Sequence, residues 1–224
     1  MKKSLIIFLL FPLLMLGQTN FEKGEKFYHE KKYAQAQPYF ESYLKSNPNH
    51  FQTIEYLANI YAYNKAWDKA IVYYKKQKAL KPWEANDYFK YGAVLGMKAK
   101  ESNKLKALGM IGEIRRSFEK AIELNPKHIE ARWGLMYYYM YLPGIFGGSE
   151  TKAIRFSNEL LKLSPVDGYL SRGQLEEYFE RYGLAEEQFK KAIAVGSTKK
   201  GTQFLSNLYK NKMNQPEKAA KIKI

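Results

Sequence analysis

The sequence predicts an all-α protein, an α-solenoid in which antiparallel helix pairs stack one after another. The first observation is in residues 51–84, where small and aromatic residues recur at the spacing of two touching antiparallel helices, at Leu57, Ala58, Tyr61, Ala70 and Tyr74. The second is a set of prolines that each close a helical segment, Pro48, Pro82, Pro126 and Pro165. They lie 34, 44 and 39 residues apart, so a period of about 34 residues recurs with two insertions.

This period predicts one elongated domain, 18–224, because each helix pair buries its apolar face against its neighbours. In the first repeat, Gly24 and Ala36 occupy close-contact positions, and Phe27 and Phe40 fill the space between the helices. Pro38 is expected in the first turn of the second helix, where an unpaired amide is normal. The predicted units are about 18–50, 51–84, 85–128, 129–167 and 166–198, with a partial unit at 199–224.

The third unit is longer than the repeat period, and its extra residues fall within 98–112. Lysines and small residues dominate this segment, so we expect lengthened helix ends with a mobile, exposed connection. Alternatively, the insertion is a projection for a specific partner, because insertions in repeat arrays tend to mark binding faces.

The fourth unit contains a distinctive loop at 142–149, which ends in Gly147, Gly148 and Ser149. The Ser149 hydroxyl is placed to cap a helix that begins at Glu150, and the glycines allow backbone angles that other residues resist. One interpretation is therefore a capped, hydrophobically anchored turn. The other is an anion site, in which the amides of Gly147, Gly148 and Ser149 face a phosphate or carboxylate beside Lys152.

The last units suggest how the stack ends. The fifth keeps Gly173 and Ala185 at contact positions, and the partial sixth, with Leu205 on its apolar face, suits a cap over the open end. From Lys190 onward the chain has nine lysines against the single acid Glu217. This basic C-terminus predicts either a solvated surface or contact with an anionic polymer or a membrane surface.

The composition limits the classes of function. With 46% hydrophobic and 26% charged residues among 224, the chain is expected to fold around a real core. It has no cysteine, which excludes disulfides, thiol nucleophiles and cysteine-ligated zinc. The three histidines are widely spread, so we expect no metal site and no cofactor. A net charge of +15 indicates an acidic partner or lysine-rich helix faces, and without a nucleic-acid-binding motif we expect no nucleic acid partner.

The N-terminus has the pattern of a secretory signal peptide, residues 1–17. A short basic start precedes an apolar run of twelve residues at 5–16, which is too short to span a bilayer comfortably as a permanent helix. We expect cleavage after Gly17, and the alternative is an uncleaved anchor. Because Met-Lys-Lys starts of this form resemble bacterial export signals, we expect a periplasmic or secreted bacterial protein.

The contact residues between about 18 and 220 resemble the tetratricopeptide-repeat superfamily. The resemblance implies a right-handed α-solenoid of about five repeats plus a truncated C-terminal capping unit. It also implies that the first helix of each repeat lines a concave groove for extended peptides or partner helices. We expect Tyr139 to be buried, since only one helix face points to the groove. The groove candidates are Tyr28, Asn59, Tyr63, Phe89, Trp133, Tyr137, Tyr141 and Tyr178.

Two details refine the resemblance. Residues 143–148, Pro-Gly-Ile-Phe-Gly-Gly, are similar to a loop in a group of exported bacterial proteins with these repeats, and that similarity brings no assigned activity. One subgroup of the superfamily binds C-terminal carboxylates with a lysine–asparagine clamp. Here Glu55 lies where that clamp would need lysine, and only Asn59 matches, which argues against this mode of recognition.

The leading hypothesis is a non-enzymatic scaffold of the bacterial envelope that holds a protein or peptide partner in the aromatic groove. No Gly-x-Ser-x-Gly turn occurs, and carboxylate pairs such as Glu176 and Glu177 are interpreted as solvated faces. The alternative is binding of cell-wall glycan or another anionic envelope polymer through the groove and the C-terminal lysines. A third possibility is a structural spacer within a surface-assembly complex.

Overall fold

The computed structural model describes residues 19–196 and 199–222, so the predicted signal peptide, 1–17, lies outside the described residues. Within the described residues the regular structure is helical throughout, which confirms the all-α prediction. The elements are α1 (Asn20–His29), α2 (Tyr33–Ser46), α3 (Phe51–Tyr63), α4 (Trp67–Leu80), α5 (Ala85–Glu101), α6 (Lys104–Leu124), α7 (Ile129–Tyr141), the 3₁₀ turn η1 (Gly144–Phe146), α8 (Glu150–Leu163), α9 (Pro165–Tyr178), α10 (Tyr182–Gly196), α11 (Lys199–Asn211) and α12 (Pro216–Ala220).

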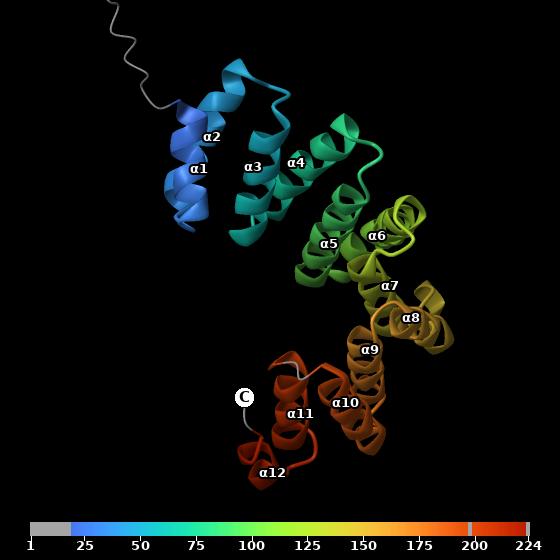
Figure 1. Cartoon of the computed structure of the whole chain (residues 1–224). Coiled ribbons are helices and arrows are strands. Elements are labelled where there is room, and N and C mark those ends of the chain that lie inside the picture. The colour runs from blue at the N-terminus through green and yellow to red at the C-terminus, as the bar shows by residue number, and fades with distance from the viewer. Residues whose placement is uncertain (1–18, 197–198, 223–224) are drawn as a thin grey trace, which may run out of the picture.

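The helices pack in chain order as pairs, α1 with α2 through α11 with α12, and the pairs follow one another along an arc (Figure 1). The first helices of the pairs lie toward the inner side of this arc, where α7 contacts both α5 and α9. This is the α-solenoid of antiparallel helix pairs that the sequence predicts. In the described ranges, no helix is both long enough and apolar enough to cross a membrane.

Within several pairs, an aromatic ring of the second helix packs against a glycine of the first. A Cβ atom on Gly24 would lie 2.7 Å from the Phe40 ring, and one on Gly173 would lie 2.3 Å from the Phe189 ring. Both rings are fully buried. A methyl group at either glycine would force the helices apart, so the close approach depends on the small residues that the sequence pattern places there.

The first, second and fifth pairs are joined by the same short turn, in which one residue adopts the left-handed conformation without being glycine. In the second pair this residue is Lys65, with φ 55°, and the N–H of Ala66 donates to the carbonyl of Tyr61 at 2.8 Å. The equivalent residues of the first and fifth pairs are Lys31 and Glu180, while the sixth pair has a longer connection in which Asn214 is left-handed. The third and fourth pairs have no left-handed non-glycine residue in their turns, because insertions replace the short turn there.

In the third pair, the insertion lengthens both helices, as expected. The connection between α5 and α6 consists of only Ser102 and Asn103. Asn103 caps α6, because its side-chain oxygen accepts a hydrogen bond from the Lys106 amide at 3.0 Å. The extra length therefore lies in the two helices themselves, and the mobility expected of their connection stays a prediction.

Pro38 lies deeper in its helix than expected. Because α2 begins at Tyr33, directly after the turn at Lys31, Pro38 falls in the second turn rather than the first. The prediction was wrong because it placed the helix start too late.

Candidate partner-binding surface

Two of the predicted groove residues of the N-terminal half, Tyr28 and Asn59, are hydrogen-bonded to each other. The Asn59 amide group donates to the Tyr28 hydroxyl at 3.1 Å, and its oxygen accepts from the Tyr74 hydroxyl at 2.8 Å. One asparagine thereby connects α1, α3 and α4. The neighbouring Glu55 is also engaged, since Lys90 of α5 donates to its carboxylate at 2.6 Å. Asn59 and Tyr28 serve the packing of the repeats.

Tyr63 and Phe89 occupy different environments. Tyr63 ends α3, is 71% exposed, and meets the Tyr33 ring edge-on with 4.7 Å between ring centroids. Phe89 is half-buried, with its ring centroid 6.0 Å from that of Phe118 and 5.3 Å from that of His128. Neither residue belongs to a larger exposed aromatic surface on the first five helices.

The C-terminal half brings four of the predicted residues together. Trp133, Tyr137 and Tyr141 are spaced by four residues along α7, and their ring centroids follow one another at 5.5 and 5.7 Å. Tyr178 at the end of α9 meets the Tyr141 ring edge-on at 5.3 Å. We call these four residues the aromatic ladder. Tyr139, on another face of α7, is buried as expected.

The aromatic ladder has a fixed end and an open end. Trp133 is 8% exposed, and its indole N–H donates to the Asp167 carboxylate at 2.8 Å. The Tyr137 hydroxyl donates to the side-chain oxygen of Gln174, and burial raises the pKa of Tyr137, so this donor stays protonated. Tyr141 and Tyr178 are 60% and 45% exposed. At the open end, the two exposed rings of Tyr141 and Tyr178 therefore rest on the hydrogen-bonded Trp133 and Tyr137.

Two charged groups flank the aromatic ladder: Lys200, which the sequence analysis did not single out, and Glu177, which it interpreted as part of a solvated face. Lys200 of α11 places its ammonium group 5.0 Å from the centre of the Trp133 ring. Glu177 is half-buried beside Tyr141, and burial raises the pKa of its carboxyl, with Lys212 acting in the opposite direction. Lys200 and Trp133 are 67 residues apart, so no local sequence pattern connects them.

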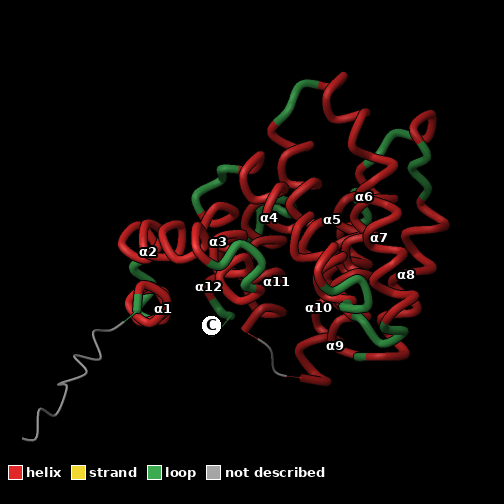
Figure 2. The backbone as a smooth tube through the Cα atoms, turned by 90° about the horizontal axis from the view of Figure 1, so that it is seen from above, coloured by secondary structure: helices red, strands yellow, loops and turns green. Residues whose placement is uncertain are grey.

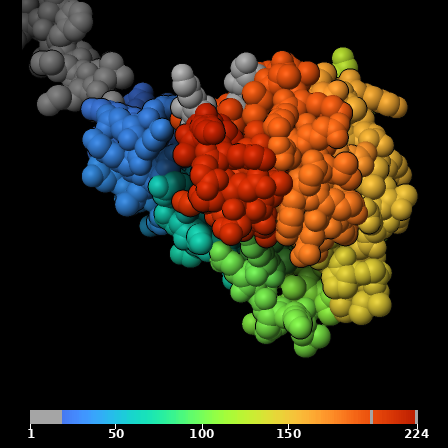
Figure 3. Space-filling model, turned by 90° about the horizontal axis from the view of Figure 1, so that it is seen from below, coloured from blue at the N-terminus to red at the C-terminus, as the bar shows by residue number. Residues whose placement is uncertain are grey.

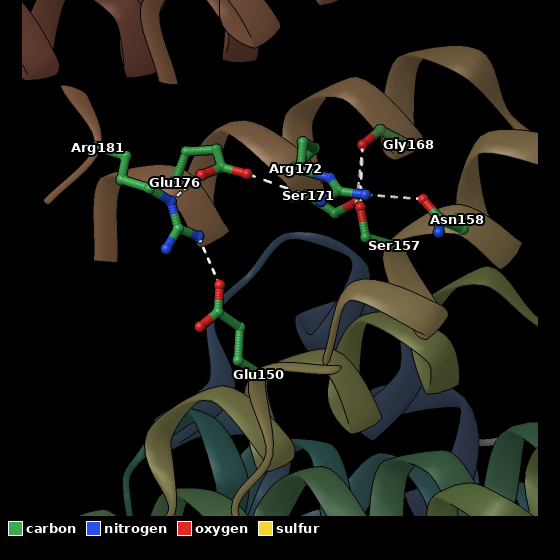
Figure 4. Close-up of polar contacts among 8 residues, drawn as sticks. All are labelled: Glu150, Ser157, Asn158, Gly168, Ser171, Arg172, Glu176 and Arg181. Atoms are coloured by element: carbon green, nitrogen blue, oxygen red, sulfur yellow. Dashed lines mark hydrogen bonds and ion pairs between the residues drawn. The ribbon is translucent and has the colours of Figure 1, made fainter. Parts of the chain in front are cut away.

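The interpretation of Glu176 as a solvated residue was wrong. Glu176 is 7% exposed and forms ion pairs with Arg181 and Arg172, and Arg181 extends to Glu150 at 2.7 Å (Figure 4). A second buried contact lies nearby, where the Ser171 hydroxyl of α9 donates to the Ser157 hydroxyl of α8 at 2.9 Å. These contacts join α8, α9 and the turn before α10.

The loop at 142–149 has its amides occupied. Gly147 donates to the Gly144 carbonyl at 3.0 Å, Gly148 to the Pro143 carbonyl at 3.1 Å, and Ser149 to the Tyr139 carbonyl at 2.9 Å. The Ser149 hydroxyl accepts from the Lys152 amide, as the predicted cap requires. These donors are unavailable to an anion, so the geometry favours a capped turn at Gly147, Gly148, Ser149 and Lys152. The turn is not anchored by its apolar residues as expected, because Ile145 is 86% exposed and Phe146 is 38% exposed.

Several C-terminal lysines have partners within the chain. Lys190 and Lys191 pair with Glu186 and Glu187 at 2.5 and 2.6 Å, each one helical turn away. Within the described part of the chain, no cluster of three metal-ligating side chains occurs. The chemistry available on the inner face is aromatic contact and hydrogen bonding, with isolated charges at its margins.

The fold is that of tetratricopeptide-repeat proteins. A thermophilic tetratricopeptide-repeat protein of Thermus thermophilus is similar in structure, with a TM-score of 0.66 and 18% identity over 85% of this chain and 98% of that one. PilW, a type IV pilus biogenesis factor, has a TM-score of 0.66 and 19% identity over 91% and 88%. YrrB, a tetratricopeptide-repeat protein with an unusual peptide-binding site, has a TM-score of 0.58 and 16% identity over 85% and 90%.

These identities establish the fold alone. No protein-family model matches the chain, and no curated protein sequence matches it.

Proposed function

We propose that this protein is a non-enzymatic scaffold that holds a peptide segment of a protein partner on its inner face. The observation that carries the proposal is the open end of the aromatic ladder, Tyr141 and Tyr178, supported by Trp133 and Tyr137. Exposed tyrosines held by an ordered base give a large contact area at little cost in side-chain entropy, and their hydroxyls still form hydrogen bonds.

The partner segment is expected to lie across α7 and α9. Glu177, half-buried next to Tyr141 and Tyr178, offers a carboxylate to a basic or hydrogen-bonding group of the segment. YrrB, whose structure has the same fold, has a peptide-binding site of its own, which supports peptide recognition as a use of this architecture.

The test compares what crosslinks to the protein in cell envelopes for the wild type and for a Tyr141→Ala/Tyr178→Ala variant. We expect a specific protein to be lost from the variant, because both exposed rings are removed while the buried base remains. Tyr63→Ala is the matched control, since Tyr63 is also exposed but lies on α3. Equal recovery with all three proteins would contradict the proposal. Glycan or lipid that is released by salt would point instead to polymer binding through the lysines.

We also propose that the protein acts in the bacterial envelope, on the evidence of the basic and apolar N-terminal pattern. The intact mass of the protein recovered from cells tests this. We expect a chain that begins at Gln18 in the periplasmic or secreted fraction. A full-length chain in the cytoplasm would contradict export.

A further inference from the structure

The two insertions of the array lie at one edge of the molecule. The α5–α6 connection and the loop at 142–149 project on the same side when the molecule is seen from above (Figure 2), and the segments around them lie together in the view from below (Figure 3). They meet at a hollow of about 310 Å³, lined by side chains of α6, α7, the loop and α8. This hollow is separate from the aromatic ladder.

The loop at this edge is held by backbone hydrogen bonds. The amides from Phe146 to Ser149 are occupied within the loop and by the end of α7, including that of Phe146, which donates to the Pro143 carbonyl at 2.9 Å. Gly147 adopts φ 95°, and a Cβ atom on Gly148 would lie 1.6 Å from the Leu142 carbonyl oxygen. Glycine at these two positions therefore allows a backbone conformation that other residues would disfavour.

The fixed loop exposes apolar side chains. Ile145 is 86% exposed and Phe146 38% exposed, although a turn anchored by its apolar residues would bury them. On the adjoining helix, Leu105 near the start of α6 is 81% exposed. An ordered loop that presents large apolar groups to solvent is typical of an interaction surface.

The chemistry of the hollow indicates which kind of partner fits. Ile111 and Phe146 supply apolar walls, while Arg115 and Lys152 supply positive charge. Glu119 accepts from one terminal nitrogen of Arg115 at 3.1 Å, and a guanidinium group carries five N–H donors in all. The Lys152 ammonium group lies 5.1 Å from the centre of the Tyr139 ring. Arg115 is therefore ion-paired with Glu119 but keeps further N–H donors, and Lys152 adds an ammonium group. An apolar hollow with these donors suits an apolar side chain that is followed by a carboxylate.

We propose that this hollow is a second docking site, which binds an acidic segment of a protein partner. The segment inserts one apolar side chain between Ile111 and Phe146 and places a carboxylate against Arg115 or Lys152. The concave shape favours a peptide over a flat lipid surface, and the chain's net charge of +15 favours an acidic partner. The site is independent of the aromatic ladder and does not require the proposed ladder function.

A random peptide library displayed on phage, selected on the full chain and counter-selected on a Phe146→Ser/Arg115→Gln variant, tests the proposal. We expect the enriched peptides to combine a Leu, Phe or Trp with neighbouring Asp or Glu. An enriched peptide, once synthesised, should bind the variant at least about tenfold more weakly than the wild type. Tyr63→Ala, at an exposed residue of α3 away from the hollow, is the control and should leave this affinity unchanged.

Each other outcome overturns the proposal. Enriched peptides that are basic, or that lack acidic residues, would exclude an acidic segment. Loss of binding in Tyr141→Ala would assign the peptides to the aromatic ladder. Vesicles of phosphatidylglycerol that bind the wild type but not the variant, without peptide enrichment, would assign the edge to a membrane. A photo-crosslinker at the exposed position 145 repeats the test without altering the hollow, and the enriched peptide should crosslink there.

Discussion

The two halves of the inner face use their tyrosines in different ways. On α1 to α5, tyrosine hydroxyls bond to neighbouring repeats, as Tyr28 does with Asn59 at 3.1 Å and as Tyr56 does with Glu25 at 2.9 Å. On α7 and α9, the aromatic ladder begins in the same way at Tyr137 but ends in two exposed rings. The same residue type therefore joins the repeats in one half and forms a candidate binding surface in the other.

The largest expected effect comes from a buried carboxyl group in the N-terminal half. Asp87 is 2% exposed and accepts a hydrogen bond from the Gln77 amide at 2.8 Å. In the described residues, its second oxygen and the Gln77 side-chain oxygen have no hydrogen-bond partner. Burial raises the pKa of Asp87 from 3.8 to about 6, against the opposing effect of Lys90.

Because the folded state holds this proton more tightly, the contribution of Asp87 to stability is fully present below pH 3.8 and is lost as the pH rises through about 6. Asp87→Asn should therefore raise the free energy of unfolding at pH 8 by up to about 3 kcal/mol. Urea unfolding of the wild type and of Asp87→Asn at pH 4 and pH 8 measures this difference in the free energy of unfolding. An equal difference at the two pH values would contradict the assignment to this carboxyl.

The second effect separates the two halves directly. Asn59→Ala removes two hydrogen bonds between helices and should lower the free energy of unfolding by about 2 kcal/mol. Tyr141→Ala, at a 60% exposed residue, should lower it by less than about 1 kcal/mol. Chemical unfolding of the two variants beside the wild type provides the measurement. A larger loss for Tyr141→Ala would show that the open end of the ladder is structural.

At the junction of the halves, His128 makes stability depend on pH. Its ring nitrogen caps α7 by accepting from the Ala131 amide at 3.3 Å, close to Glu130 and Arg132 and beside Phe89. Burial lowers its pKa below 6.5, more than Glu130 raises it.

The unfolded chain therefore binds the His128 proton more readily, so this contribution to stability is present above pH 6.5 and is lost as the pH falls below it. His128→Asn keeps a side chain that caps helices well without titrating. Below pH 6.5, the melting temperature of the wild type should fall more steeply with pH than that of His128→Asn. A difference that does not change with pH would contradict the role of His128.

The smallest effect tests whether the halves share one repeat geometry. Lys31 and Glu180 occupy the same left-handed turn in opposite halves, each with φ 59°. Lys31→Gly and Glu180→Gly should each raise the free energy of unfolding by about 1 kcal/mol, because glycine adopts the left-handed conformation without strain. The matched Lys31→Ala and Glu180→Ala variants keep the strained backbone angle, so their free energy of unfolding should not rise. Stabilisation by alanine as well as glycine would show that the backbone angle is not the cause.

The sequence predicts the parts of this structure that depend on local spacing. Gly24 and Phe40 indicate how one pair packs, Ser149 caps its helix, and the four-residue spacing of Trp133, Tyr137 and Tyr141 places them on one face. The contacts of Asn59 and the buried ion pairs of Glu176 are not predictable in this way, because their partners lie on other helices.

Contacts along the arc are harder still to predict. Lys200 reaches Trp133 only because successive pairs curve back toward one another, and small rotations between pairs set that curvature. The exposure of Ile145 was also missed, since it depends on a loop that satisfies its own hydrogen bonds without burying its apolar side chains.

A partner bound to the aromatic ladder should protect the helices that carry it. Hydrogen exchange of the protein, with and without the partner captured by crosslinking, measures this protection. We expect the partner to slow exchange in α7 and α9, around Tyr141 and Tyr178, and to leave α1 to α4 unchanged. Slower exchange confined to α1 to α4, or to the outer helices, would contradict it.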